Sequence, residues 1–166
     1  MILKSLLKFL EDKKIKYEII KHKTVYTAID AAGTQHVKPD EIIKTLVMNL
    51  DNKYALALIS ASKNLDKDKF KKAANVWAKK NNAKVVKIIG FAKEIWMKKN
   101  LKGGVGATPP FGELIEMPTL VDAFLLKQKN LFINTGDYEY SVKLSRAGFE
   151  KAIGKEMFKG TFSKKK

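Results

Sequence analysis

Two apolar segments separated by the pair Asp51-Asn52 constrain the fold of this chain more than any other feature. Residues 42–50 read IIKTLVMNL, and residues 54–60 read YALALIS. The first segment is rich in β-branched and apolar residues, which favour a strand, the second is also mostly apolar, and Asp and Asn favour a tight turn between them. The pattern therefore predicts a β-hairpin at the centre of the protein.

Helix and strand patterns alternate before this hairpin and after it, and strand patterns cluster toward the end of the chain. We expect helices at residues 2–13, 28–32, 65–80, 92–98 and 146–153, with Thr27 and Ser145 as N-caps and Gly33 as a stop. Strands are expected at residues 15–19, 84–89, 119–125, 131–136 and 138–144. In the helix at 92–98, Ile95 and Trp96 are expected to contact the core. We find no internal repeat, so residues 1–166 are predicted to form a single domain in which helices flank a mixed β-sheet, and residues 164–166 are expected to fray.

The charge of the chain is strongly positive and comes almost entirely from lysine. Lys and Arg number 33 against 17 Asp and Glu, a net charge of +16, and Arg146 is the only arginine. Such a balance favours binding to polyanions, either nucleic acid or an anionic membrane surface. The scarcity of arginine argues against bidentate reading of bases in a groove. Genome composition and solubility are the alternative explanations of this lysine content.

Several functional classes are excluded by what the sequence lacks. There is no cysteine, which excludes disulfides, cysteine-ligated zinc, iron–sulfur clusters and thiolate nucleophiles. With His22 and His36 as the only histidines, a three-histidine zinc site is impossible, although sites of His and carboxylate remain open. Lys4 and Lys8 interrupt the first apolar run, and no segment reaches 18 uncharged apolar residues. We therefore expect a cytoplasmic protein without a metal or cofactor.

Lys44 is the most informative charged residue. On a strand it would share a face with Ile42, Leu46, Met48 and Leu50, because side chains alternate between the two faces. A lysine there either snorkels at the edge of the sheet or lies in a pocket. A pocket lysine would need an anion such as a phosphate or carboxylate as its partner.

Glycine and proline are concentrated in one segment, residues 101–118, which reads LKGGVGATPPFGELIEMP. It contains neither GxxxxGK[ST] nor GxGxxG, so it matches no nucleotide-binding signature. The backbone around Gly104 and Gly106 could hold a small polar ligand or polarise a reacting carbonyl, and the prolines would stiffen it. A rigid loop without chemistry is the alternative. The chain also lacks GxSxG, HExxH and a Ser-His-Asp order, and His22 is as well explained by a structural hydrogen bond as by a general base.

Five segments in one order carry a resemblance to a known family. They are HKTVYTAIDAA (22–32), DEIIKTLVMNL (40–50), GATPPFG (106–112), TLVDAFL (119–125) and INTGDYEYSVKLS (133–145). Together they resemble the YbaK/ProX family of aminoacyl-tRNA deacylases, which also occur as editing domains of prolyl-tRNA synthetases. The similarity covers residues 22–153, outside which lie the first residues and a basic tail at 160–166.

This resemblance implies a curled mixed α+β (α/β) fold and trans-editing, the hydrolysis of the ester between a wrong amino acid and a tRNA. Aminoacyl-tRNA would be the substrate, and an aminoacyl-tRNA synthetase is a candidate partner. In that family the lysine that matches Lys44 is needed for activity. It lies beside the terminal nucleotide of the tRNA substrate. The family's Gly-x-x-x-Pro pattern matches residues Gly106 to Pro110. The backbone of Gly106 would hold the aminoacyl group. A water would be positioned by backbone groups and by the ribose hydroxyl of the substrate. Further candidates for substrate binding are His22, Thr27, Gly104, Ala107, Pro110, Asp122 and Gly136.

One departure from the family leaves the substrate open. The family often has a Thr-Gly pair shortly before the glycine loop, whereas this chain reads NLKGG at residues 100–104. Because pocket walls set which side chain is accepted, the amino acid removed could be Cys, Ala, Ser, Pro or another small residue. Two other functions remain open, a non-catalytic tRNA-binding or RNA-binding module and a protein that binds a small nucleotide.

Overall fold

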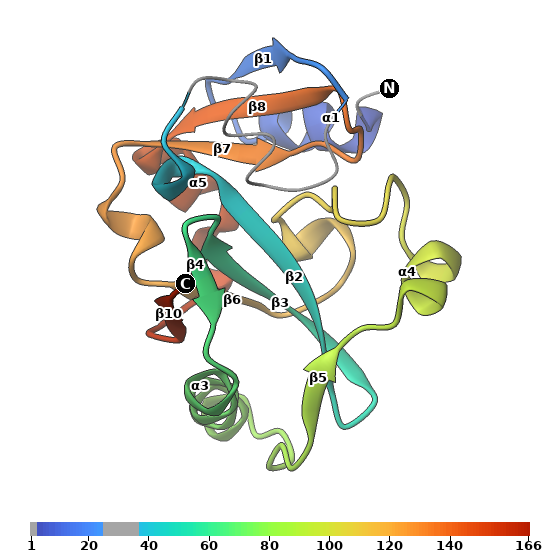
Figure 1. Cartoon of the computed structure of the whole chain (residues 1–166), viewed down its shortest axis with the longest axis vertical. Helices are drawn as coiled ribbons and strands as arrows, with labels where there is room; N and C mark the ends of the chain where they lie inside the picture. Colours follow the sequence, from blue (N-terminus) through green and yellow to red (C-terminus); the bar gives the residue numbers. More distant parts are fainter. Residues whose placement is uncertain (1–2, 25–36) are drawn as a thin grey trace.

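The computed structural model describes residues 3–24 and 37–166, and the predicted hairpin lies at its centre (Figure 1). Strands β2 (Ile43–Leu50) and β3 (Lys53–Ser60) pair antiparallel, from Ile43 opposite Ser60 to Leu50 opposite Lys53. Asp51 and Asn52 have φ angles of 51° and 69°. Positive φ at both central residues is the requirement of a type I′ turn, which matches the twist of the paired strands. The hairpin prediction is confirmed.

The hairpin forms the middle of a five-stranded sheet of order β5-β2-β3-β6-β9. The edge strand β5 (Ile89–Phe91) runs antiparallel to β2, whereas β6 (Thr119–Asp122) and β9 (Met157–Gly160) run parallel to β3 and β6, so the predicted mixed sheet is confirmed. The strand predicted at 84–89 is wrong. The Asp51 carboxylate accepts the backbone N–H groups of Lys87 and Ile88 at 2.7 and 2.8 Å, which removes these donors from strand pairing.

A second, antiparallel sheet of order β1-β8-β7 packs beside the first (Figure 1). It contains β1 (Glu18–Lys21), β7 (Asn130–Asn134) and β8 (Tyr140–Ser145). A parallel bridge between Ile42 and Phe132 connects this sheet to the start of β2, which gives the curled arrangement that the resemblance implies. The first of these strands begins three residues later than predicted.

Helices cover both faces of the central hairpin because both faces are apolar. Four α-helices occur among the described residues: α1 (Lys4–Asp12), α3 (Lys67–Lys80), α4 (Glu94–Asn100) and α5 (Arg146–Ile153). Leu56 and Leu58 of β3 face a core cluster that contains side chains of α1 and α5, whereas Ala57 and Ile59 face a second cluster beneath α3. Ser145 caps α5 as predicted, since its hydroxyl accepts the Gly148 N–H at 3.0 Å.

Short elements complete the chain, and some lie away from their predicted places. The 3-10 helices are η1 (Pro39–Glu41), η2 (Gly112–Leu114), η3 (Leu125–Lys127) and η4 (Gly154–Glu156). Ile95 is 83% exposed, so its predicted core contact is wrong, whereas Trp96 stacks on Tyr54 of β3 with ring centroids 3.6 Å apart. The helix predicted at 28–32, with Thr27 and Gly33, lies outside the described residues, as does His36. No helix in the described ranges is both long and apolar enough to cross a bilayer.

The C-terminal tail is ordered, contrary to the expectation that it frays. Residues Ser163–Lys165 form β10, which pairs antiparallel with β4 (Lys63–Leu65). The buried Asp122 holds this tail, because its carboxylate accepts the N–H groups of Phe162 and Ser163 at 2.8 and 3.1 Å and the Ser163 hydroxyl at 2.6 Å. The Phe162 ring is fully buried against Phe70 of α3.

We expect Asp122→Ala to lower the free energy of unfolding by about 3 kcal/mol, because it leaves buried donors without an acceptor. Urea denaturation measures this loss, and hydrogen exchange should show that β9 and β10 lose protection first. The control is Glu150→Ala, an exposed carboxyl on α5, which should change stability by less than about 0.5 kcal/mol. Equal effects of the two substitutions would show that Asp122 does not hold the tail.

Candidate active site

The glycine-rich loop is fastened to a turn that follows β7 about thirty residues later. The Gly104 N–H donates to the Gly136 carbonyl and the Gly136 N–H donates to the Ala107 carbonyl, both at 2.8 Å. The Tyr138 hydroxyl donates to the Val105 carbonyl at 2.6 Å. The structure thus brings together Gly104, Ala107 and Gly136, three residues that the sequence predicted separately.

Glycine is required at this junction because the two backbones approach so closely. A Cβ atom on Gly103 would lie 2.8 Å from the Gly136 Cα, and one on Gly136 would lie 2.7 Å from the Leu3 side chain. Both residues also have φ of +89°, a region that L side chains rarely adopt. A side chain on Gly104 would meet the Tyr138 ring. The fit of loop and turn therefore depends on small residues at several positions.

Gly106 lies at the exposed tip of the loop. Residues 104–107 form a turn closed by a 3.0 Å hydrogen bond from the Ala107 N–H to the Gly104 carbonyl. Gly106 has φ of +84° at the third position, as a type II turn requires. Within the described ranges its N–H donates to no acceptor of the chain. From Ala107 through Pro110 the chain is buried, so an exposed donor sits on a rigid base.

A cavity of about 530 Å³ adjoins this loop, a volume within the range of roughly 300–1,000 Å³ common for small-ligand sites. Its walls come from the start of α1, the end of α4 and residues 108–117. Apolar side chains from these walls include Leu3, Trp96, Phe111 and Leu114, and the carboxyls of Glu113 and Glu116 also line it. The cavity could accept a small side chain beside the loop.

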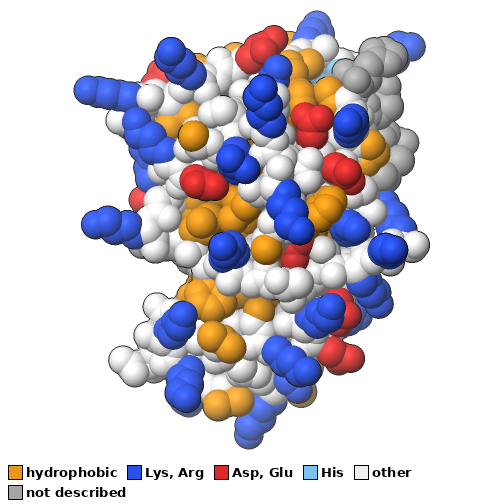
Figure 2. Space-filling model, turned by 90° about the vertical axis from the view of Figure 1, so that its left-hand side faces the viewer, with side chains coloured by type: hydrophobic (Ala, Val, Ile, Leu, Met, Phe, Trp, Pro, Cys, Tyr) orange, Lys and Arg blue, Asp and Glu red, His pale blue; other side chains and the backbone are white. Residues whose placement is uncertain are grey.

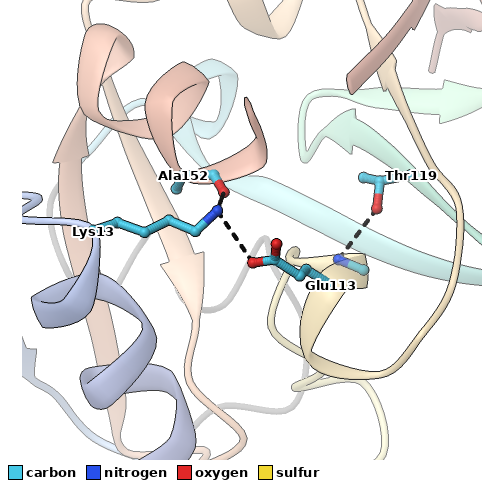
Figure 3. A network of polar contacts seen from close by, with 5 residues as sticks. Lys13, Glu113, Thr119 and Ala152 are labelled. Atoms are coloured by element: carbon cyan, nitrogen blue, oxygen red, sulfur yellow. Dashed lines mark hydrogen bonds and ion pairs between the residues drawn. The ribbon is translucent and has the colours of Figure 1, made fainter. Parts of the chain in front are cut away.

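Polar contacts fix the wall formed by residues 112–117 (Figure 3). The Lys13 ammonium, at the end of α1, pairs with the Glu113 carboxylate at 3.1 Å and donates to the Ala152 carbonyl of α5 at 3.2 Å. The Thr119 hydroxyl accepts the Gly112 N–H at 3.1 Å. The wall is therefore tied to two helices and a strand, and its position does not depend on a ligand.

Lys44 lies on β2 and points to the side covered by α3, as the alternation of side chains predicts. It shares this side with Leu46, Met48 and Leu50, whereas Ile42 packs in a separate cluster with Phe132. The Lys44 ammonium is half-buried and donates to the Lys63 carbonyl of β4 at 3.3 Å. Burial, and then the nearby charge of Lys166, lower its pKa below the ordinary value. No described carboxylate forms an ion pair with it, so an anion would be a favourable partner.

Two other predicted residues have their polar atoms engaged by the chain itself. His22 Nδ1 lies 2.8 Å from the Lys23 carbonyl, which can only accept, so Nδ1 carries the proton and Nε2 accepts from the Ser141 hydroxyl at 3.0 Å in the neutral ring. The Asp122 carboxylate holds the C-terminal tail. Both geometries are structural, and roles of these residues toward a substrate stay predictions.

The predicted site residues fall into two groups. Gly104, Ala107 and Gly136 meet at the loop, with Gly106 and Pro110 in the same segment, whereas Lys44 is hydrogen-bonded to β4. No hydrogen bond joins Lys44 to the loop within the described residues, and Thr27 lies outside them. Among those residues, no three or more His, Asp or Glu side chains gather as a metal site would require.

Sequence reasoning missed two residues near these groups. Tyr138 clamps the loop, and its only signal was its place two residues after Gly136 in a turn-like segment. Thr45 is 8% exposed on β2, and its hydroxyl has no hydrogen-bond partner in the described structure. Nothing in a strand of apolar residues marks such a hydroxyl as unpaired.

Comparisons with known proteins define the class of this fold. A crystal structure of the hypothetical protein APE2540 superposes with a TM-score of 0.80 at 18% identity, covering 97% of this chain and 100% of that one. A crystal structure of a candidate trans-editing enzyme for prolyl-tRNA synthetase superposes with a TM-score of 0.74 at 17% identity, covering 96% and 95%. At these identities the likeness shows the fold, which is an α+β domain with a mixed sheet. A search of curated proteins finds no match.

The family is defined by a sequence model. The model of the aminoacyl-tRNA editing domain matches residues 22–152, which include β2, the glycine loop and the Gly136 turn. The chain therefore belongs to the aminoacyl-tRNA editing domain family, and the resemblance to the YbaK/ProX family is confirmed.

The lowered pKa of Lys44 predicts how a substitution changes stability with pH. Between the lowered pKa and 10.5, the unfolded chain binds more protons at this residue than the folded chain does, so the charged form costs stability and the cost disappears as pH rises. Relative to Lys44→Met, wild type should therefore gain stability between pH 7 and pH 10.5.

Urea denaturation of both proteins across this pH range measures the difference, in which the titration of lysines that do not interact with Lys44 cancels. Lys129→Met, at an exposed lysine, is the control and should show a flat difference. A flat difference for Lys44→Met as well would mean that Lys44 is not desolvated in the folded protein.

Proposed function

We propose that this protein hydrolyses the ester bond of mischarged tRNAs that carry a small amino acid. The observation that carries the proposal is the family match over residues 22–152, which includes a rigid loop with an exposed backbone donor at Gly106. The proposed setting is the cytoplasm, with aminoacyl-tRNA as the substrate and an aminoacyl-tRNA synthetase as a candidate partner. The net charge of +16 supports contact with a polyanionic substrate.

The reaction needs no nucleophilic side chain, because an aminoacyl ester is an activated bond. The oxygen of a water attacks the ester carbonyl carbon, the bond to the ribose oxygen breaks, and the proton of the water ends on the released ribose hydroxyl. The Gly106 N–H would donate to the carbonyl oxygen as negative charge develops there, which stabilises the transition state. Orientation of ester and water by the loop would supply much of the remaining rate.

Lys44 would bind the terminal nucleotide. Its half-buried ammonium has no carboxylate partner in the described structure. A phosphate of the nucleotide would provide an anionic partner for this ammonium. In this proposal Gly106 acts on the reacting carbonyl and Lys44 holds the nucleotide end, which agrees with their separate positions on the loop and on β2. The aminoacyl side chain would enter the cavity beside Trp96 and Phe111, whose size limits what is accepted.

The test is release of labelled amino acid from a panel of tRNAs mischarged with Cys, Ala, Ser or Pro. We expect wild type to hydrolyse one or two members of the panel, and Lys44→Ala to lower kcat/KM by about 100-fold, a loss in the range expected when one partner of a partly buried charge pair is removed. The matched control is Lys129→Ala, which removes the same charge from an exposed position and should keep full activity.

Intact hydrolysis by Lys44→Ala, with wild type active, would contradict the role given to Lys44. No release from any member of the panel, together with salt-sensitive tRNA binding, would favour a non-catalytic tRNA-binding module of the same fold. Protection by a mononucleotide against thermal unfolding, without affinity for tRNA, would instead favour a nucleotide-binding protein.

A further inference from the structure

The positive charge of this protein is concentrated in one segment. Residues 67–102 contain twelve lysines and two acidic residues, Asp68 and Glu94, a net charge of +10. This leaves +6 of the total of +16 for the other 130 residues. The segment contains α3, β5 and α4, and α3 and β5 form the lower end of the molecule in Figure 1. About a fifth of the chain therefore carries more than half of its net charge.

Few of these lysines are engaged by the protein itself, two of them through aromatic rings, with the Lys67 and Lys80 ammonium groups 5.1 and 5.4 Å from the ring centres of Phe91 and Phe158. Within the described structure, the only ion pair of the segment joins Lys98 to Glu94 at 3.2 Å, between two exposed side chains. Eleven of the twelve lysines are exposed, and Lys71 is half-buried. Figure 2 shows lysines around hydrophobic side chains in the lower part of the molecule. The charge is therefore available to a partner.

The same segment exposes large apolar side chains. Of the six exposed large hydrophobic residues in the described structure, five belong to it: Val76, Val85, Ile88, Phe91 and Ile95. Phe91 is 50% exposed on the edge strand β5, with the Lys67 ammonium 5.1 Å from the centre of its ring. An aromatic ring beside lysines is a feature of surfaces that contact both the phosphates and the bases of RNA.

The end of this segment reaches the candidate active site. Trp96, Asn100 and Lys102, at the end of α4 and just after it, line the cavity beside the glycine loop. A ligand that places one end in this cavity would therefore meet the charged segment with the part that extends from it. A second copy of this chain does not fit, because two faces of +10 would repel each other.

We propose that the surface of residues 67–102 is the docking face for the body of a tRNA whose aminoacyl end occupies the candidate site. This inference rests on the proposed function. Lysines bind the phosphates without reading sequence, because an ammonium is a point charge. Phe91 and its apolar neighbours contact exposed bases or sugars.

The test compares two variants that each remove four charges. The docking variant carries Lys69→Gln, Lys72→Gln, Lys84→Gln and Lys87→Gln. The control variant carries Lys16→Gln, Lys127→Gln, Lys129→Gln and Lys151→Gln, four exposed lysines outside the segment. Binding of uncharged tRNA is measured as a function of salt for both variants. We expect the docking variant to bind at least about tenfold more weakly and to lose about three units of the slope of log K against log salt, with little change in the control.

Hydrolysis of a small substrate, the 3′-aminoacyl ester of adenosine, separates this inference from the proposed function. Both variants should hydrolyse it at the wild-type rate, because it lacks the tRNA body that the substituted lysines are proposed to bind. If wild type hydrolyses neither the ester nor any mischarged tRNA, the proposed function is wrong. The docking face is still tested in that case by comparing tRNA binding of the two variants.

Equal loss of tRNA affinity in the two variants, or no loss in the docking variant, would overturn the docking face. Phe91→Ala is a further check, since it should weaken tRNA binding without changing the salt slope, and an unchanged affinity would contradict base contact at this edge. Binding of the wild type to vesicles that contain phosphatidylserine, without binding to tRNA, would assign the face to a lipid surface instead.

Discussion

The burial of both faces of the hairpin formed by β2 and β3 is the constraint on which the rest of this structure depends. Six consecutive residues of β3, 55–60, are buried, so neither face can remain against water. At roughly 25 cal/mol per Å² of apolar area, burial of both faces provides the main stabilisation of the folded state. Different structural elements must therefore pack on each face. One cover is α3, and the other is formed by α1, α5 and the second sheet. The placement of Lys44 follows from this, because a strand buried on both faces leaves room for a charge only near its end.

The packing of the two sheets also positions the glycine loop and its backbone donor at Gly106. The loop lies between α4 and β6, and its partner turn follows β7, so two segments distant in sequence meet only when both sheets are in place. Their backbones bond in both directions and the Tyr138 hydroxyl adds a third link. The N–H groups of Gly104 and Gly136 donate across this junction and that of Ala107 donates to the Gly104 carbonyl within the loop, whereas that of Gly106 has no acceptor among the described residues. An open backbone donor on a fixed base is a geometry suited to carbonyl polarisation.

Sequence patterns predicted correctly those elements that are determined by residues adjacent in the chain. The hairpin followed from its apolar segments and Asp51-Asn52, and α5 from its cap at Ser145. The signals failed where a distant side chain decides the outcome. Asp122 converts an apparently frayed tail into β10, and Asp51 takes the amides that residues 84–89 would need for a strand. For the site, composition identified the loop and alternation identified the direction of Lys44, but neither reveals that Tyr138 lies against the loop.

The charged segment and the glycine loop are distinct parts of the molecule, and under the proposed function they would recognise different parts of the substrate. Under the proposed function, the aminoacyl side chain would enter a cavity lined by apolar side chains and by the carboxyls of Glu113 and Glu116, where size and shape would decide what is accepted. The tRNA body offers phosphates at regular spacing, and lysines bind these without regard to sequence, because an ammonium lacks the planar fork that reads base edges. With one arginine in the chain, Arg146, and twelve lysines in residues 67–102, the proposed recognition of the tRNA body would be permissive, whereas that of the aminoacyl group would be selective. Editing in trans requires selectivity for the wrong amino acid rather than for the tRNA, and under the proposed function this would follow from the use of lysine rather than arginine and from the position of the lysines.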